Sequence, residues 1–314
     1  MPVPKYFLEP QIASVLTYEA LVPAIRQALI DYSAGPTGGV DQPLRSILRV
    51  KDGQGNPTGW FAAMPVIAGD FMAVKTVTFF PGNTALTGDA ALPTHLAMIE
   101  LLDRATGQPL AVMDGRLITE MRTAAVSAVA AQALAPEAKT LGILGSGVQA
   151  QSHIEALRVV NAAFHQPGSI RIWSRNQDKA TSLAADMGAT VVSIEEAAAC
   201  DVVLTVTAAT QPVLLGKWLS PNSLVIGVGA VSPHSRELDD DVMAGTLIAE
   251  SRQGAENESG DVLLSGAKVF AEIGEVMAGT APPIPGGRRV FKSVGMAIED
   301  LVGARLVWDA LKNA

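Results

Sequence analysis

Three basic residues stand where basic side chains are uncommon, and together they suggest a site for an anionic ligand. In the strand-like run 71–80, strict alternation puts Lys75 on a face that is otherwise apolar. Arg122 lies close after Thr119, which we expect to be the N-cap of an Ala-rich helix, so its charge would oppose the helix dipole. Arg45 lies in another strand-like run. A small carboxylate is the simplest shared ligand, because guanidinium groups bind carboxylates bidentately.

Each cation also has a purely structural interpretation. Lys75 could extend to the sheet edge, with its stem on apolar surface. Arg122 could pair with Glu120, and Arg45 and Arg49 could share a solvent-facing side of their strand. If Arg122 occupies the first turn of its helix, the substitution Arg122→Ala should leave the fold intact and slightly favour the helix.

A glycine-rich turn between a strand-like run and a helical run predicts a dinucleotide site. The spacing is Gly-x-Gly-x-x-Ala, in which the first glycine permits a tight turn and the second lets a pyrophosphate approach the backbone. The alanine keeps the helix close to the sheet, and the helix N-terminus faces the phosphates. A further strand follows where the motif requires it. The expected cofactor-binding residues of the turn are Gly145, Ser146, Gly147, Val148, Gln149 and Ala150.

The strand that follows ends in Ser174-Arg175-Asn176, which bears on the choice of cofactor. An NAD-selective site usually carries Asp or Glu at this point to bind the ribose 2′-hydroxyl. A hydroxyl, a guanidinium and an amide instead suit a 2′-phosphate. We therefore expect NADP to be preferred, with NAD as a second cofactor, unless Arg175 is simply a solvated loop residue.

Two kinds of element pattern must position these residues. The first part of the chain reads as a helix followed by strands separated by turns, typical of an antiparallel sheet; the second alternates strands and helices, typical of a parallel sheet with helical crossovers. The expected elements of the first part are a helix over 18–33, strands over 44–50, 60–66 and 71–80, a helix over 95–103 and a strand over 110–114.

Composition restricts the classes of function. The 314 residues carry a net charge of −8 without a basic run, which argues against a nucleic-acid surface. Hydrophobic residues make up 48% and charged residues 17%, enough for a large core. No signal peptide or membrane-spanning run is visible, so we expect a cytoplasmic protein. The single cysteine excludes an internal disulfide, and the four histidines lack metal-ligand spacing, so no metal site is expected.

Taken together, these motifs are similar to those of the ornithine cyclodeaminase/μ-crystallin family, over nearly the whole chain. The matching segments are Arg45 in Leu-Arg-Ser-Ile, Lys75, Pro81-Gly-Asn83, 117–125 around Arg122, 145–150, Glu258-Ser-Gly-Asp261 and 291–300. The resemblance implies an α/β fold with a Rossmann-type doubly wound parallel sheet domain over 119–292. It also implies an α+β domain for substrate binding and dimerisation over 1–118 plus 293–314, with a mainly antiparallel sheet, and a homodimer formed through that domain.

The resemblance also implies roles for individual residues. Arg45, Lys75 and Arg122 would bind the substrate carboxylate, with Thr94 nearby and Lys75 and Arg122 as catalytic residues. Lys75 would supply or relay a proton to the imine nitrogen. The remaining residues expected at the substrate and nicotinamide are Thr207, Val231 and Ser293.

One loop favours a branch of the family. Cyclodeaminases carry, after the strand that ends near Gly229, an Asp that deprotonates the substrate amine; Val231 aligns with it, and neither neighbour is a base. The run 232–239 resembles the μ-crystallin branch, whose members reduce cyclic ketimines. The expected reaction is NAD(P)H-dependent reduction of Δ1-pyrroline-2-carboxylate or Δ1-piperideine-2-carboxylate to L-proline or L-pipecolate. The alternatives are an ornithine cyclodeaminase, an open-chain L-amino-acid dehydrogenase and a non-catalytic small-molecule binder.

Overall fold

The computed structural model describes residues 3–313 and divides the chain into two compact units. Unit 1 contains residues 3–21, 35–122 and 296–313, and unit 2 contains residues 22–34 and 123–295. Two of the boundaries fall inside helices, α2 (Tyr18–Ser33) and α3 (Gly115–Leu134).

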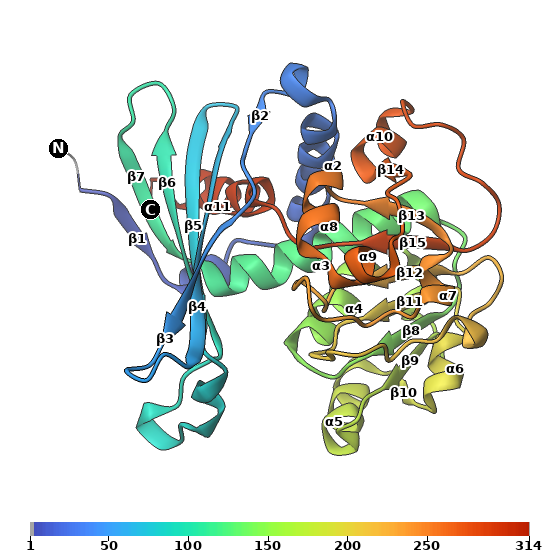
Figure 1. Cartoon of the computed structure of the whole chain (residues 1–314). Helices are drawn as coiled ribbons and strands as arrows, with labels where there is room; N and C mark the ends of the chain where they lie inside the picture. The colour runs from blue at the N-terminus through green and yellow to red at the C-terminus, as the bar shows by residue number, and fades with distance from the viewer. Residues whose placement is uncertain (1–2, 314) are drawn as a thin grey trace. The chain divides into compact units, whose positions relative to one another are not determined.

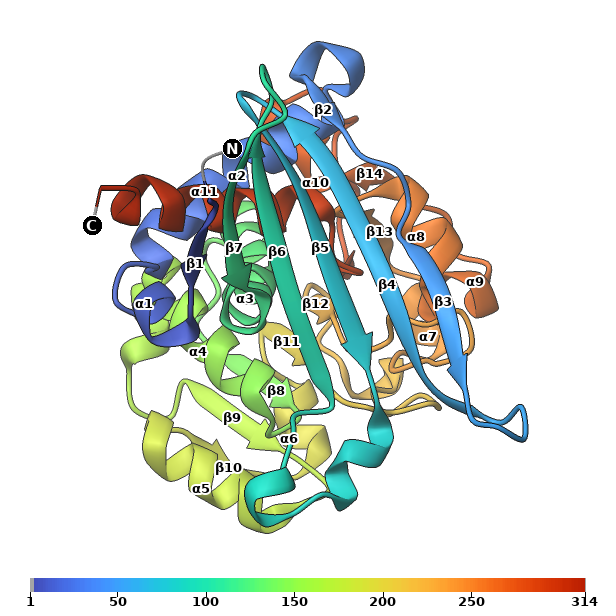
Figure 2. The ribbon, with the colours of Figure 1, turned by 90° about the vertical axis from the view of Figure 1, so that its left-hand side faces the viewer.

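Unit 1 is built on a seven-stranded sheet in the order β1-β7-β6-β5-β4-β2, with β3 also paired to β4 (Figure 2). All pairings are antiparallel except β1 with β7. The strands are β1 (Lys5–Phe7), β2 (Val40–Asp41), β3 (Ser46–Lys51), β4 (Pro57–Ala68), β5 (Phe71–Phe79), β6 (His95–Asp103) and β7 (Pro109–Asp114).

Strand β6 (His95–Asp103) corrects the expected helix over 95–103. Its sequence contains good helix formers such as Leu, Met and Glu, so local propensity favours a helix. Hydrogen bonding to β5 on one side and β7 on the other decides otherwise. Ile99 and Leu101 are buried in alternation with more exposed neighbours, the pattern of a strand with one covered face.

Helix α11 (Ala297–Leu311) lies against β4, β5 and β6 of unit 1 and covers one face of this sheet. The side chain of Gln42 accepts a hydrogen bond from the Ile298 amide at 2.8 Å, which fixes the first turn of the helix. The short elements of unit 1 are α1 (Glu9–Ala13) and three 3-10 turns, η1 (Gly35–Gly38), η2 (Pro81–Ala85) and η3 (Gly88–Ala90). The covered face carries the buried side chains of Ala62, Met64, Val66, Ala73, Val77, Ile99 and Leu101.

Unit 2 is built on an eight-stranded, entirely parallel sheet in the order β10-β9-β8-β11-β12-β15-β13-β14 (Figure 1). The chain winds in both directions from β8, which is the doubly wound order of nucleotide-binding sheets. The predicted fold class is confirmed. The strands are β8 (Leu141–Leu144), β9 (Ile170–Trp173), β10 (Thr190–Val191), β11 (Val202–Thr205), β12 (Leu224–Gly227), β13 (Thr246–Ala249), β14 (Ala271–Glu272) and β15 (Arg289–Lys292).

Helical connections join these strands. The central strands β8, β11 and β12 are buried at every residue, as expected for a parallel sheet covered on both faces. The helices are α4 (Val148–Val160), α5 (Gln177–Met187), α6 (Ile194–Ala198), α7 (Asp240–Met243), α8 (Arg252–Glu258), α9 (Gly260–Ser265) and α10 (Ile273–Ala278), with 3-10 turns η4 (Ala162–His165) and η5 (Gly216–Trp218).

The start of α3 differs from the expectation that Thr119 is its N-cap. The helix begins at Gly115, and the carboxylate of Asp114 accepts a hydrogen bond from the Arg116 amide at 2.8 Å. Arg122 therefore lies in the second turn. The predicted conflict between its charge and the helix N-terminus was wrong, because the effect of the dipole fades beyond the first turn.

Candidate functional site

Lys75 is buried in the middle of the unit 1 sheet. It lies in β5 between β4 and β6, on the face that α11 covers, and only 2% of the residue is exposed. Its ammonium lies 2.9 Å from Oδ1 and 2.7 Å from Oδ2 of Asp300 in α11. Burial and the charge of Arg122 lower the pKa of Lys75 to about 8, against the raising effect of Asp300. The sheet-edge interpretation of Lys75 is wrong, and this ammonium can give up a proton near neutral pH.

Arg122 of α3 is buried against the same pair of acids. Its Nε donates to Oδ1 of Asp300 at 3.0 Å, and its Nη1 donates to the carboxylate of Glu299. Arg122 is 5% exposed, Glu299 is fully buried and Asp300 is 1% exposed. Asp300 thus links Lys75 to Arg122 within unit 1.

The charges of this cluster nearly cancel before any ligand is considered. Lys75 and Arg122 are two cations, and Glu299 and Asp300 are two carboxylates. Arg45 adds a third cation, close enough that its charge also lowers the pKa of Lys75. A ligand that carries one carboxylate would therefore bring the cluster to neutrality, which favours its binding at a desolvated site.

Glu299 and Asp300 were not predicted as functional residues. Both lie in the first turn of α11, where acidic side chains are ordinarily explained by the helix dipole. The available signal was their position in a helix whose neighbouring residues are almost all apolar. Buried acids of this kind require cationic partners, and the sequence offered three.

Within the unit 1 sheet, Thr94 lies away from this cluster. Thr94 precedes β6, and Lys75 pairs with Ile99, so about five residues of strand, roughly 16 Å, separate them along the sheet. The Thr94 hydroxyl instead lies 3.1 Å from Nδ1 of His95. Ser293 belongs to unit 2, where its amide donates to the Gly227 carbonyl after β15.

The glycine-rich turn joins β8 to α4 in unit 2. Gly145 adopts φ +133°, and a Cβ there would lie 2.8 Å from the Val206 carbonyl oxygen, so only glycine fits. Gly147 is the N-cap of α4, and a Cβ built on it meets no atom within 4 Å. Ala150, in the first turn of α4, is fully buried. This open space at the N-terminus of a 13-residue helix fits a pyrophosphate.

The end of β9 lies beside that turn. The Ser146 hydroxyl donates to the Ser174 hydroxyl at 2.9 Å, and the Asn176 side chain caps α5 by accepting from the Lys179 amide at 2.9 Å. Arg175 between them is exposed, and its guanidinium makes no hydrogen bond or ion pair within residues 3–313. Two of the three residues therefore support the loop, while Arg175 is available to a ligand.

The segments after β11 and β12 hold the two remaining predicted cofactor residues. The amide and hydroxyl of Thr207 donate to Glu237 at 2.6 and 2.7 Å. Val231 is 46% exposed, and its amide donates to the Gly229 carbonyl at 3.2 Å. The first acidic residue after Val231 is Glu237, which is fully buried.

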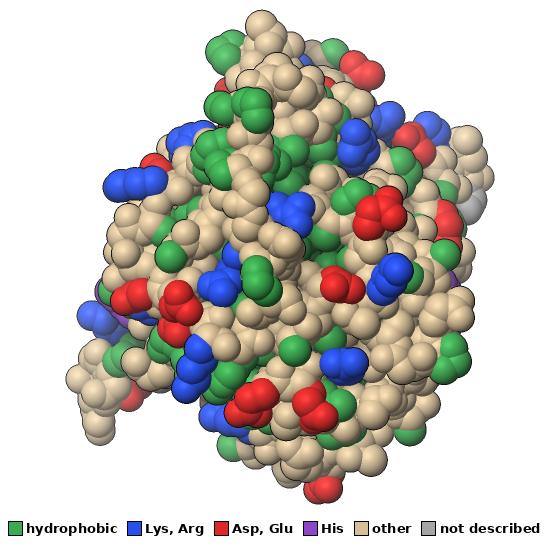
Figure 3. All heavy atoms as spheres, turned by 90° about the vertical axis from the view of Figure 1, so that its right-hand side faces the viewer, with side chains coloured by type: hydrophobic (Ala, Val, Ile, Leu, Met, Phe, Trp, Pro, Cys, Tyr) green, Lys and Arg blue, Asp and Glu red, His purple; other side chains and the backbone are tan. Residues whose placement is uncertain are grey.

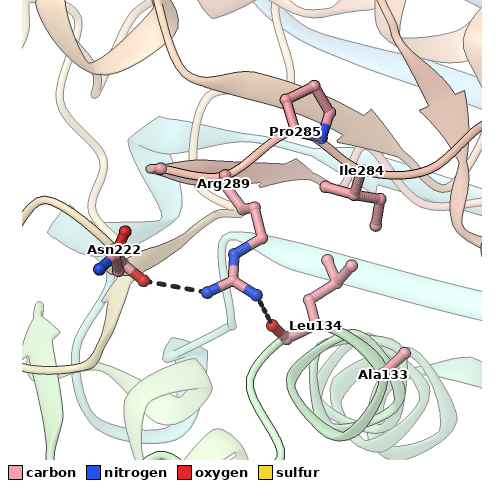
Figure 4. A pocket seen from close by; sticks show the side chains of 8 residues that line it. Ala133, Leu134, Asn222, Ile284, Pro285 and Arg289 are labelled. Carbon is pink, nitrogen blue, oxygen red and sulfur yellow. Dashed lines mark hydrogen bonds between the residues drawn. The ribbon is translucent and has the colours of Figure 1, made fainter.

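A pocket of about 270 Å³ lies in unit 2, at the end of the parallel sheet away from the glycine-rich turn (Figure 4). Arg289 begins β15 and Asn222 precedes β12, so the pocket opens at the amino ends of the strands. Arg289 donates to the carbonyls of Leu134 and Asn222, which fixes the pocket wall. Dinucleotides bind at the carboxyl ends of such strands, so this pocket is not the cofactor site.

Other functional classes gain no support from the described residues. No group of three metal-ligating side chains occurs among them, and none of their helices is long and apolar enough to span a bilayer. On the face drawn in Figure 3, acidic and basic side chains are interspersed, without a gathering of one sign.

A doubly wound sheet with a glycine-rich phosphate turn is typical of a dinucleotide-dependent α/β protein, and the other unit of this chain holds a buried cluster of cations and carboxylates. The model of the ornithine cyclodeaminase/mu-crystallin family matches residues 7–314. The chain belongs to this family, and the predicted family is confirmed.

The chain is similar to a named relative and to solved structures over nearly its whole length. The ketimine reductase mu-crystallin of Mus musculus is 43% identical over 298 residues, covering 92% of this chain and 91% of that protein. The Δ1-pyrroline-2-carboxylate reductase of Thermococcus litoralis, solved with NADH and L-proline, is 31% identical, with a TM-score of 0.87 and 98% of each chain covered. An archaeal alanine dehydrogenase dimer with bound NAD is 28% identical, with a TM-score of 0.89 and 99% and 97% covered.

Proposed function

We propose that this protein reduces a cyclic imino acid, Δ1-pyrroline-2-carboxylate or Δ1-piperideine-2-carboxylate, with a reduced nicotinamide cofactor. The observation that carries the proposal is the buried Lys75–Asp300–Arg122 cluster, a carboxylate site beside an ammonium that can give up its proton. The 43% identity to a ketimine reductase and the likeness to a reductase solved with NADH and L-proline support the same reaction.

The roles that we propose for the unit 1 residues follow from the charges of their side chains. Arg122 and Arg45 bind the substrate carboxylate, and Lys75 donates a proton to the imine nitrogen as the carbon accepts hydride. A protonated C=N bond is already electrophilic, so holding and protonating the imine are the main tasks of the protein. Asp300 keeps the Lys75 ammonium protonated, because its negative charge raises the pKa of that group.

In unit 2, the turn Gly145–Ala150 would hold the pyrophosphate, and Thr207, Val231 and Ser293 would lie at the nicotinamide, whose reduced form supplies the hydride. Arg175 is proposed to bind a 2′-phosphate, so that NADPH is used in preference to NADH. The exposure of Arg175 and the absence of an acid at the end of β9 support that choice. The functional division into 1–118 plus 293–314 and 119–292 is part of the proposal.

An ornithine cyclodeaminase is disfavoured by the loop after β12. By the family resemblance, a cyclodeaminase would carry in this loop a carboxylate that takes a proton from the substrate amine, whereas this chain has Val231 there. An open-chain amino-acid dehydrogenase is the rival supported by an observation, the likeness to the archaeal alanine dehydrogenase. A non-catalytic binder would have no need of a proton donor beside a carboxylate site.

We further propose a homodimer formed through the open face of the unit 1 sheet, and a cytoplasmic location. Figure 2 looks onto this face, with α11 behind the strands. Alternation that buries one set of side chains leaves apolar residues on the other face, among them Tyr6, Leu48, Leu96 and Met98, which are 42–65% exposed. A second copy is the expected cover, because symmetric oligomers use the same surface twice.

A turnover assay tests the proposed reaction. The purified protein is mixed with NADPH or NADH and with both cyclic imines, pyruvate plus ammonia, or L-ornithine plus NAD⁺. We expect rapid oxidation of the reduced cofactor only with a cyclic imine. Turnover of pyruvate and ammonia at a higher kcat/KM would favour the dehydrogenase, and no turnover with any substrate would favour the binder.

A further inference from the structure

Three charged residues that the proposed reaction leaves without a role, Glu237, Asp261 and Lys292, meet inside unit 2. Thr205, Gly227 and Lys292 end the neighbouring parallel strands β11, β12 and β15, and the strand register places them in one row. Glu237 follows β12, and Asp261 lies in the first turn of α9. The side chains of Thr205, Glu237, Asp261 and Lys292 are fully buried.

The Glu237 carboxylate accepts hydrogen bonds from the end of β11 and from the segments that follow β11 and β12. One carboxylate oxygen accepts from the amide and hydroxyl of Thr207, at 2.6 and 2.7 Å. The other accepts from the Thr205 hydroxyl at 2.9 Å and from the Gly229 amide at 2.7 Å. Four donors converge on a single carboxylate, which favours its ionised form against the cost of burial.

Asp261 and Lys292 hold Glu237 in this place. Oδ1 of Asp261 accepts from the amides of Glu237 and Leu238 at 2.8 and 3.0 Å, and Oδ2 lies 3.1 Å from the Lys292 ammonium. Burial raises the pKa of Glu237, and the positive charge of Lys292 is the strongest opposing influence. Lys292 therefore supports both carboxylates.

Gly229 is packed tightly between Thr207 and the Glu237 carboxylate. A Cβ at Gly229 would lie 2.2 Å from the Thr207 carbonyl oxygen and 2.6 Å from the Glu237 carboxylate. Any side chain there would displace one of them. The segments after β11 and β12 are thus fixed to each other through Glu237.

We propose that Glu237, held by Asp261 and Lys292, is a positioning residue that fixes Thr207 and the 229–231 loop for the nicotinamide end of the cofactor. This inference rests on the proposed function, which places the nicotinamide at those segments. The pyrophosphate turn after β8 makes no hydrogen bond to this carboxylate within the described residues. Glu237 consequently acts on the nicotinamide half of the cofactor and leaves the adenosine half alone.

The test compares whole cofactors with their adenosine halves. Calorimetry measures the Kd of NADPH and of 2′-phospho-ADP-ribose, and in parallel of NADH and of ADP-ribose, for wild type and Glu237→Gln. The amide nitrogen of Gln accepts no hydrogen bond, so the two donors that face it lose their acceptor. We expect the Kd of the whole cofactor to rise at least tenfold, with the Kd of the half unchanged within twofold.

Two further variants make the result decisive. Thr205→Val removes one buried hydrogen-bond donor to Glu237 and changes no residue proposed to contact the cofactor. It should raise the Kd of the whole cofactor several-fold and leave the Kd of the adenosine half unchanged. This variant keeps the test valid even if Glu237→Gln folds poorly. Glu272→Gln is the matched control, because Glu272 also accepts from a hydroxyl (Ser33) and an amide (Arg252) but lies on the edge strand β14. The inference would be overturned if the Kd of the whole cofactor and the Kd of the adenosine half rose equally, or if neither variant changed the Kd of the whole cofactor. A wild-type protein that binds no nicotinamide cofactor would instead refute the proposed function.

Discussion

The ammonium of Lys75 and the carboxylate of Asp300 lie 2.7 Å apart, although 225 residues separate them in the chain. Both are buried, and Arg122 shares the same carboxylate. The pair sets the protonation state of the group that we propose as proton donor. In the proposed reaction, the substrate carboxylate would bind beside acids that are already in place.

The pH dependence of catalysis should report on this pair. The pKa of Lys75 is lowered to about 8, so kcat/KM for imine reduction should fall as pH rises above about 8 and the ammonium loses its proton. Asp300 raises that pKa, so in Asp300→Asn the fall should begin at lower pH. Titration of the imine itself is common to both enzymes and cancels in the comparison. Identical pH profiles for the two enzymes would contradict a proton donated by Lys75.

The stability of the fold should depend on pH for the same reason. In the folded state Lys75 releases its proton at about pH 8, and its ordinary pKa is 10.5. Between these values the unfolded chain binds more protons, so the contribution of Lys75 to the free energy of unfolding rises with pH, by up to about 3 kcal/mol. Denaturant unfolding of wild type and Lys75→Met at pH 7 and pH 10 measures it. From pH 7 to pH 10, the free energy of unfolding of wild type should increase relative to that of Lys75→Met.

Arg122→Ala should cost stability as well as activity, contrary to the expectation from the sequence. The substitution leaves Glu299 and Asp300 with one fewer buried cation, and the cost of breaking a buried ion pair is about 3–5 kcal/mol. Adding Glu299→Gln removes one of the two buried negative charges that Arg122 balanced and should restore part of the loss, without restoring turnover. Chemical denaturation of both variants checks this, and a double variant no more stable than the single one would argue against the ion pair.

Cofactor preference should follow Arg175. We expect kcat/KM for NADPH to exceed that for NADH in the wild type, and Arg175→Ala to lower the NADPH value about tenfold or more while the NADH value stays the same. Lys268→Ala, which removes another exposed cation of unit 2, is the control. A wild-type preference for NADH would refute this assignment.

L-Ornithine should not be converted to L-proline. Val231 cannot accept a proton, His234 is exposed, and Asp261 is fully buried against Lys292. Mass spectrometry of products formed from L-ornithine with catalytic NAD⁺ is the measurement, with Δ1-pyrroline-2-carboxylate reduction as the positive control. Proline and ammonia formed at a comparable rate would show that another group serves as base.

The oligomeric state should respond to one substitution on the open face of the sheet. Wild type is expected near twice its 32.6 kDa by light scattering, and Met98→Glu should shift the population toward the monomer, because charges would be buried on both copies. Leu264→Glu, at an apolar residue of similar exposure on α9, should have no effect. An unchanged mass for Met98→Glu would argue against this interface.

Features that depend on neighbouring residues could be predicted from the sequence. The phosphate turn is local, since Gly145, Gly147 and Ala150 fall within six residues at the junction of β8 and α4, and the structure places them accordingly. The alternation that marked Lys75 is equally local and indicated the correct face of β5. Net charge and composition likewise argued against broad classes of function, since they require no knowledge of packing.

Features that depend on distant residues were decided only by the tertiary structure. Strand β6 forms because β5 and β7 pair with it, although its own residues favour a helix. The partners of Arg122 lie 177 and 178 residues further along the chain, and no sequence period connects them. Glu299 and Asp300 have an ordinary explanation in the dipole of α11. Their pairing with Lys75 and Arg122 arises only when the helix packs on the sheet, because burial removes water and leaves those two cations to balance their charges.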